Sequence, residues 1–322
     1  MPFAFDAYVT DALFDRSGSL AFALGDGAVR WEDGGSVQAH EGAILCAAAH
    51  PSGQGLITGG DDGRLVWSRD GSSEVLAQAK GRWIDVVASS AATGLIAFAA
   101  GREVMVRSSR DAKLAITLMH ERSVAGLDFD PKGRRLAAAT YGGVALWYAG
   151  IAEQKPQMLK WAGSHVLVAF SPDGRFLVSA MQENELHGWK LADGGNMRMG
   201  GYPSKVKSLV FVEKGRLMAT AGASGAVIWP FAGSSGPMGK QAAEVGFQEG
   251  SVVTRVAGTP DAPRLVAGLS DGRVWTADLG GGGVRFIKAE KGEPISALAI
   301  SPDGRRIAWG DEAGNAGAAE TA

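Results

Sequence analysis

A segment that recurs about every 40 residues is the feature that most constrains this chain. Each copy contains short apolar runs of four to seven residues, rich in Val, Leu, Ile, Ala and aromatic residues and bounded by turn residues. Such runs predict β-strands rather than helices. Eight copies can be aligned, 35 to 47 residues apart. Their first runs begin near Val9, Ile44, Ile84, Val124, His165, Val206, Val253 and Ile295.

The turn after the first run is repeated almost letter for letter. "FSPDG" begins at Phe170, "ISPDG" at Ile300 and the looser "FDPKG" at Phe129. Proline presets φ in such a turn, the Asp side chain bonds nearby backbone, and glycine accepts a positive φ. The chain has 47 glycines, more than twice the usual share of about 7%. The pattern therefore predicts many copies of one antiparallel sheet, each of which needs the same tight turn.

Packing the copies around an axis would bury the two faces that a sheet of about four strands cannot bury alone. The third run of a copy often ends in tryptophan, as at Trp31, Trp67, Trp147, Trp189 and Trp229. This ending, together with the period, resembles the WD-repeat β-propeller family from Ala7 to about Ala319. The family's Trp-Asp dipeptide is absent, and its Gly-His dipeptide is replaced by Ala39-His40 and Met119-His120. The resemblance implies the family's fold and structural hydrogen bonds at His40 and His120.

We therefore expect an all-β fold, a β-propeller of WD-repeat type with eight blades of four antiparallel strands, forming one domain over residues 1–322. Seven blades are the alternative. Linkers such as Ser72 to Gln78 and Ala112 to Leu118 are expected to supply the outer strands. Little chain follows the last unit, so Pro2 to Asp6 are expected to pair there and close the ring, as an N-terminal strand does in many members of this family.

Composition excludes several classes of function. A net charge of −2 argues against a nucleic-acid binder, because such proteins are usually strongly basic. No run of about 18 apolar residues predicts a membrane span, and the N-terminus has no signal-peptide pattern. Cys46 is the single cysteine and lies in the apolar run "AILCAAA", which indicates a buried, unreactive thiol. We expect a cytoplasmic protein.

No motif for catalysis, metal binding or cofactor binding is found. The five histidines include no pair at a metal-ligand spacing, and there is no Gly-x-Ser-x-Gly motif. Asp61-Asp62 lacks the spacing of a calcium loop and indicates a β-turn. We expect a protein that is not an enzyme, with no cofactor and no metal. Since some propellers are hydrolases or lactonases, an enzyme with its site at the axial channel is an alternative.

Counting four residues back from each inner strand gives loop positions on one end of the ring, which in the family is the usual partner-binding face. These positions hold His40, Lys80, His120, Trp161, Tyr202, Glu249 and Lys291. Arg82, Trp83 and Arg122 lie in the same loops. Arg, Trp and Tyr are the residues enriched at interface hot spots. The predicted partner-binding residues are Arg82, Trp83, Arg122, Trp161, Tyr202 and Lys80. In the alternative interpretation, Trp83 and Trp161 fill gaps between blades.

The predicted function is a non-enzymatic scaffold that binds a protein or peptide around the channel. A basic and aromatic face would suit an acidic peptide, because Arg pairs with carboxylates through two hydrogen bonds. A structural subunit of a larger assembly is a further alternative, and a large exposed apolar patch on a blade rim would favour it.

Overall fold

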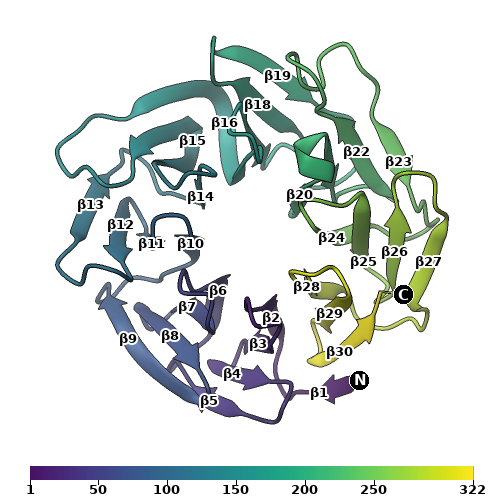
Figure 1. The fold of residues 1–322 in the computed structure, drawn as a ribbon, viewed down its shortest axis with the longest axis horizontal. Helices are drawn as coiled ribbons and strands as arrows, with labels where there is room; N and C mark the ends of the chain where they lie inside the picture. The colour runs from purple at the N-terminus through teal and green to yellow at the C-terminus, as the bar shows by residue number, and fades with distance from the viewer. Residues whose placement is uncertain (322) are drawn as a thin grey trace.

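The strands form a closed ring of antiparallel sheets around a central axis (Figure 1). The structure is a computed structural model and describes residues 1–321. In each four-stranded sheet an inner strand lies next to the axis and the other strands step outwards (Figure 1). Such a ring lets neighbouring sheets bury one another's faces, which is the reason the sequence repeats.

The first three sheets follow the chain in order. They contain β2 (Val9–Phe14), β3 (Leu20–Leu24), β4 (Ala28–Trp31) and β5 (Ser36–Gln38); then β6 (Ile44–Ala49), β7 (Leu56–Gly60), β8 (Arg64–Arg69) and β9 (Ser72–Gln78); then β10 (Val86–Ser90), β11 (Leu95–Ala100), β12 (Glu103–Ser108) and β13 (Ala115–Met119).

One larger sheet comes next. It contains β14 (Gly126–Phe129), β15 (Arg135–Tyr148), β16 (Gln157–Phe170), β17 (Phe176–Met181), β18 (Leu186–Lys190) and β19 (Gly195–Met199).

Three further sheets complete the ring. They contain β20 (Leu209–Val212), β21 (Leu217–Thr220), β22 (Ala226–Pro230) and β23 (Ala243–Val245), with a 3₁₀ turn, η1 (Glu213–Gly215), after β20; then β24 (Val253–Gly258), β25 (Arg264–Leu269), β26 (Val274–Asp278) and β27 (Val284–Lys288); then β28 (Ile295–Ile300), β29 (Arg306–Asp311), β30 (Asn315–Glu320) and β1 (Pro2–Ala4).

Residues 1–321 thus form seven hydrogen-bonded sheets, six of four strands and one of six. The expectation of eight separate four-stranded blades is wrong, and the count of seven given as the alternative matches. The difference arises in the six-stranded sheet, where two sequence units are joined. The first part of β16 pairs with β15, and its second part, from His165, pairs with β17. Because β16 runs on without a loop, the outer strand of one unit continues into the inner strand of the next.

The ring closes where expected. β1 pairs antiparallel with β30, with Pro2 opposite Gly317 and Ala4 opposite Asn315. Phe3 and Phe5 pack against Phe22 of the next sheet, with ring centroids 5.3 and 5.4 Å away. The N-terminal strand therefore completes the last sheet and covers the seam. The predicted outer strand at Ser72 to Gln78 is also confirmed as β9.

The core lies between neighbouring sheets, and glycines at one repeated position allow close approach. A Cβ placed on Gly59, Gly268 or Gly310 would lie 2.4–2.5 Å from a side chain of the neighbouring sheet. That side chain stands at, or just before, the start of the neighbouring inner strand. Those neighbours are Ile84, Ile295 and Val9 respectively. Real side chains do not approach so closely, so each glycine makes room for a branched side chain of the next sheet.

Candidate functional site

The end of the ring where the chain enters the inner strands is here called the entry face. It carries loops such as residues 79–85 and 120–125, and the hairpins that join the second and third strands of a sheet. The Ser-Pro-Asp-Gly turns lie at the other end of the inner strands, called the turn face. The predicted residues therefore share one end of the ring, but their side chains point to different places.

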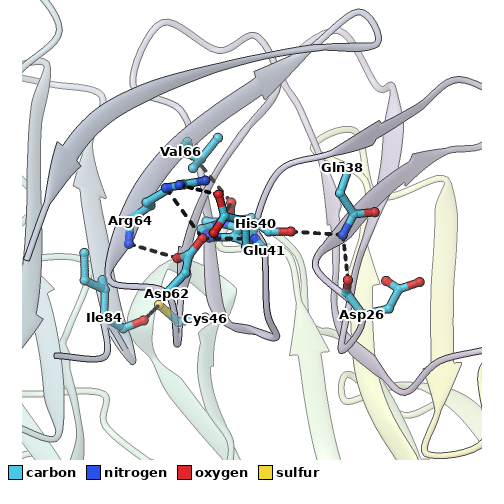
Figure 2. Close-up of polar contacts among 10 residues, drawn as sticks. Asp26, Gln38, His40, Glu41, Cys46, Asp62, Arg64, Val66 and Ile84 are labelled. Carbon is cyan, nitrogen blue, oxygen red and sulfur yellow. Dashed lines mark hydrogen bonds and ion pairs between the residues drawn. The ribbon is translucent and has the colours of Figure 1, made fainter. Parts of the chain in front are cut away.

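His40 is held inside the ring by hydrogen bonds that involve both ring nitrogens (Figure 2). Its Nε2 lies 2.8 Å from Thr58 Oγ1, and its Nδ1 lies 2.9 Å from Asp62 Oδ1. The Asp62 carboxylate also accepts from the backbone N–H groups of Arg64 and Glu41. Burial alone would raise the pKa of Asp62, but these hydrogen bonds hold it below its usual range. The network ties the loop that enters β6 to the hairpin after β7.

Two other units have a different set of hydrogen bonds in the place of the His40 network. The Trp147 Nε1–H donates to His120 Nε2 at 2.9 Å, so His120 Nδ1 carries the proton. No Asp stands in the adjoining hairpin, and His120 Nδ1 is buried without a hydrogen-bond partner in the described chain. In the other unit, Tyr202 takes the place of the histidine. Its hydroxyl lies 2.6 Å from Thr220 Oγ1 and accepts from Trp229 Nε1 at 2.6 Å.

A groove of about 560 Å³ opens beside His120 on the entry face. We call it the Met119 groove. Its walls come from the end of β13, the start of β16 and the middle of β15. There the chain turns back at Gly142 and Gly143, so that the Ala149 N–H reaches the Arg134 carbonyl oxygen and β15 forms a hairpin. The residues that define the groove are Met119, His120, Arg122, Tyr141, Lys155, Met158 and Lys160.

The Met119 groove combines exposed apolar side chains with positive charge. Met119, Tyr141 and Met158 are 58%, 65% and 42% exposed. Three cations line the groove and a single acid, Glu121, accompanies them. The cations are Arg122, Lys155 and Lys160, none of which has a carboxylate within 4.0 Å among residues 1–321. An apolar surface with unneutralised cations can bind a segment that has both apolar and acidic side chains.

The loop of residues 79–85 adjoins this groove through Arg82. Its guanidinium donates to Glu103 Oε2 at 2.9 Å and to the Ala100 carbonyl oxygen. Glu103 stands opposite Met119 in the β12–β13 pair. The hydrogen bond from Arg82 lowers the pKa of Glu103, so both groups are charged and largely neutralise each other. Trp83, next in the loop, is 64% exposed, and Lys80 is exposed as well.

Two predicted contact residues do not lie on the free surface. Tyr202 is only 8% exposed, and its hydroxyl is used by Thr220 and Trp229. Trp161 is half-buried and stacks on His187 with ring centroids 3.8 Å apart. Tyr202 therefore packs within the ring, and Trp161 packs against a residue of its own sheet. Of the six predicted residues, only Arg122 lines the Met119 groove.

Five of the residues that define the groove were missed by counting from inner strands: Met119, which ends the outer strand β13, and the four described next. Tyr141 lies in a hairpin, and Lys155, Met158 and Lys160 precede or belong to an outer strand. A signal existed in "KPQMLK", where Met158 and Lys160 are two residues apart and so share a face of a strand. Leu159 between them is buried, which is the alternation expected of such a strand.

No group of three or more His, Cys, Asp or Glu side chains suited to a metal ion occurs in residues 1–321. The Cys46 residue is partly exposed, but its thiol contacts the Ile84 carbonyl oxygen at 3.5 Å, and burial of the sulfur raises its pKa (Figure 2). Within the same residues, no helix has the length and apolar character needed to cross a bilayer.

Comparison with known proteins agrees with this architecture. The WD40 family, described as "WD domain, G-beta repeat", matches residues 31–68, a segment that contains His40, Thr58 and Asp62. The fold is similar to that of the computationally designed Ika8 protein in its crystal structure. The TM-score is 0.79 at 17% identity, covering 98% of this chain and 97% of that one. At this identity the likeness concerns the fold alone. No curated protein matches the chain.

Proposed function

We propose that this chain, a β-propeller of the WD-repeat family, is a non-enzymatic interaction scaffold whose Met119 groove binds an acidic segment of a partner protein. The observation that carries the proposal is the pairing of exposed Met119, Tyr141 and Met158 with the unpaired cations Arg122, Lys155 and Lys160 in one cavity. Apolar side chains of this size are costly to leave in water, so their gathering favours a role in binding.

The proposed mechanism is rigid presentation. Met158 and Lys160 are on β16, which pairs with the second half of β15 through Gly143↔Lys160 and Ala145↔Met158. His120, which is held by Trp147, fixes the chain between Met119 and Arg122. Because the walls are already ordered, a peptide that binds here would order few protein groups, which lowers the entropic cost of association.

Each charge has a distinct part in the proposal. Arg122 would take a partner carboxylate through two hydrogen bonds, and Lys155 and Lys160 would act as point charges along the groove. Met side chains adapt to different apolar partners, so Met119 and Met158 would accept more than one residue type. Trp83 and Lys80 would extend the surface, whereas Arg82 is already neutralised by Glu103. We also propose that the ring acts as one domain in a cytoplasmic setting, as expected from the sequence.

A selection of displayed random peptides on the purified protein tests the proposal. Enriched sequences should combine Asp or Glu with a large apolar residue. Their binding should weaken about tenfold or more in the Arg122→Ala/Lys160→Ala variant, and should weaken further as salt concentration rises. Met238→Ala is the matched control, because Met238 is an exposed methionine outside the groove. Enrichment of peptides without acidic residues, or equal binding by the double variant, would refute the proposal.

A further inference from the structure

A second cavity lies at the turn face, between the second and third sheets. It has a volume of about 430 Å³. β12 connects the two ends of the ring: its first residue, Glu103, is opposite Met119, whereas Arg107 near its other end is opposite Ala115. This cavity, here called the Arg107 pocket, is therefore separate from the Met119 groove. Its polar lining includes Arg107, Arg110, Ser108, Ser109, His50 and Glu74.

Arg107 is a cation with unused hydrogen-bonding capacity. Its guanidinium makes one hydrogen bond, from Nη1 to the Val106 carbonyl oxygen at 3.0 Å. Neither Arg107 nor Arg110 has a carboxylate within 4.0 Å in the described chain. The Arg107 side chain is partly withdrawn from water, and this burial lowers its pKa. Binding of an anion would stabilise a guanidinium that is partly buried and has no counter-charge.

Arg110 supplies a second positive charge at a fixed position. Its Nη1 donates to the Ala92 carbonyl oxygen at 3.3 Å and its Nη2 to the Ala91 carbonyl oxygen at 3.0 Å. Both bonds reach to the turn between β10 and β11. The Arg110 side chain is therefore held across the rim of the pocket, where it raises the local positive potential, while Arg107 keeps its remaining donors free.

The opposite wall is aromatic and rigid. The Trp67 ring lies between His50, with centroids 3.9 Å apart and planes 10° apart, and the Arg69 guanidinium, 3.9 Å from the ring centroid. Trp67 Nε1 also donates to the Gln54 carbonyl oxygen at 2.9 Å. Burial, and then the charge of Arg69, lower the pKa of His50 to about 4, so His50 is neutral near pH 7. The remaining wall is apolar and is formed by Val75, Leu76, Ile96 and Leu114.

We propose that the Arg107 pocket binds a small organic carboxylate, with the carboxylate on the Arg107 guanidinium and an apolar body against Leu76, Leu114 and the edge of the Trp67 ring. The single acid of the lining, Glu74, selects between anions. It stands opposite Trp67 in the β8–β9 pair, on the rim of the pocket. Its charge disfavours doubly charged phosphate, whereas a singly charged carboxylate matches the one free guanidinium. This site is independent of the Met119 groove and of the function proposed for it.

Titration of the ¹⁵N-labelled protein tests the assignment, with the indole N–H signal of Trp67 as the reporter. The Trp67→Phe variant identifies that signal. Phenylacetate should move it in a saturable manner. Uncharged phenylacetamide and inorganic phosphate should bind at least about tenfold more weakly. Tighter binding of phosphate, or equal binding of the amide, would overturn the proposal, as would a Trp67 signal that phenylacetate does not move.

Variants locate the binding group. Arg107→Leu should weaken phenylacetate binding about tenfold or more. Arg107→Lys should weaken it less, because it keeps the charge but loses the planar pair of donors. Arg134→Gln is the matched control, since Arg134 is an exposed arginine at the turn after β14, outside the pocket. Thermal unfolding confirms that each variant is folded; if Arg107→Leu does not fold, Arg107→Lys provides the test. Unchanged affinity in a folded Arg107 variant would show that the guanidinium does not bind the carboxylate.

Discussion

Asp62 Oδ1 lies 2.9 Å from His40 Nδ1, and this contact joins the loop that enters β6 to the hairpin between β7 and β8. His120 occupies the equivalent place two units later, but its Nδ1 has no partner in residues 1–321. Of the three units compared, the His40 unit thus has the full His–Asp network, and the His120 and Tyr202 units have different hydrogen bonds in its place. The His120 unit, which has no acid in this hairpin, is the unit that has the Met119 groove.

Loss of the Asp62 carboxylate should destabilise the ring. Asp62→Ala removes the acceptor for His40 and for the N–H groups of Arg64 and Glu41, at a cost of about 1–3 kcal/mol. Because the folded pKa of Asp62 lies below its unfolded value, its contribution is present above the unfolded pKa of about 4 and is lost as pH falls through the folded pKa. Urea unfolding at pH 7 and pH 3 measures both effects. Asp61→Ala is the control, and an equal loss in both variants would contradict the assignment.

A second aspartate should have the opposite pH dependence. Asp128 Oδ2 accepts from the Phe170 N–H at 2.7 Å, across the inner strands β14 and β16. Burial raises the pKa of Asp128 to about 7 despite this hydrogen bond. The folded protein therefore keeps a proton that the unfolded chain releases near pH 4, so this group makes stability fall as pH rises from about 4 to about 7.

Asp128→Asn keeps an oxygen that can accept from Phe170 but cannot ionise. The variant should unfold at a higher temperature than the parent at pH 8, and at about the same temperature at pH 4. Thermal unfolding of both proteins across pH 4–9 measures the difference. Parallel pH profiles would show that Asp128 does not titrate in this range.

Close approach between sheets predicts a cost for added side-chain volume. Gly310→Ala would place a Cβ 2.4 Å from Val9 at the seam, and relief of that clash should cost about 1–3 kcal/mol. Gly283→Ala is a matched control, because its Cβ would have no neighbour within 4 Å. Denaturant unfolding compares the two. A Gly310→Ala protein as stable as the control would mean that the sheets pack less tightly than the structure shows.

Tyr202 should matter for stability and not for partner binding. Tyr202→Phe leaves the Trp229 Nε1–H and the Thr220 hydroxyl without their shared partner, which should cost about 1–3 kcal/mol. Peptide affinity at the Met119 groove should remain unchanged. Thermal unfolding and peptide titration of the same preparation separate the two effects. Weaker peptide binding without loss of stability would mean that Tyr202 contacts the partner.

The periodic turns made most of the fold predictable. Turn residues at both ends of Ser72 to Gln78 predict β9, and the lack of an outer run in the last unit predicts closure by β1. The blade count failed at Gly163, which adopts a φ of +121° where the chain passes from one unit to the next. Because no loop intervenes there, β16 serves two units, and a spacing rule has no means of detecting that continuity.

The candidate site was less predictable, because strand spacing gives the position of a loop and not the direction of a side chain. Tyr202 and Trp161 point into the ring because Thr220, Trp229 and His187 offer them partners from distant parts of the sequence. Conversely, Met158 and Tyr141 reach the entry face from a strand and a hairpin that the count omits. Only the three-dimensional arrangement brings them beside Arg122.

Affinity of a selected acidic peptide for the Trp83→Ala/Arg122→Ala variant tests the central claim most directly. Both side chains are exposed, so the variant should unfold at nearly the parent temperature while its peptide affinity falls about tenfold or more. Tyr148→Ala/Arg134→Ala is the matched control, since Tyr148 is exposed to a similar extent and lies beside Arg134 at the turn face, away from the groove. Parent-like affinity in the first variant, or an equal loss in the control, would contradict binding at the entry face.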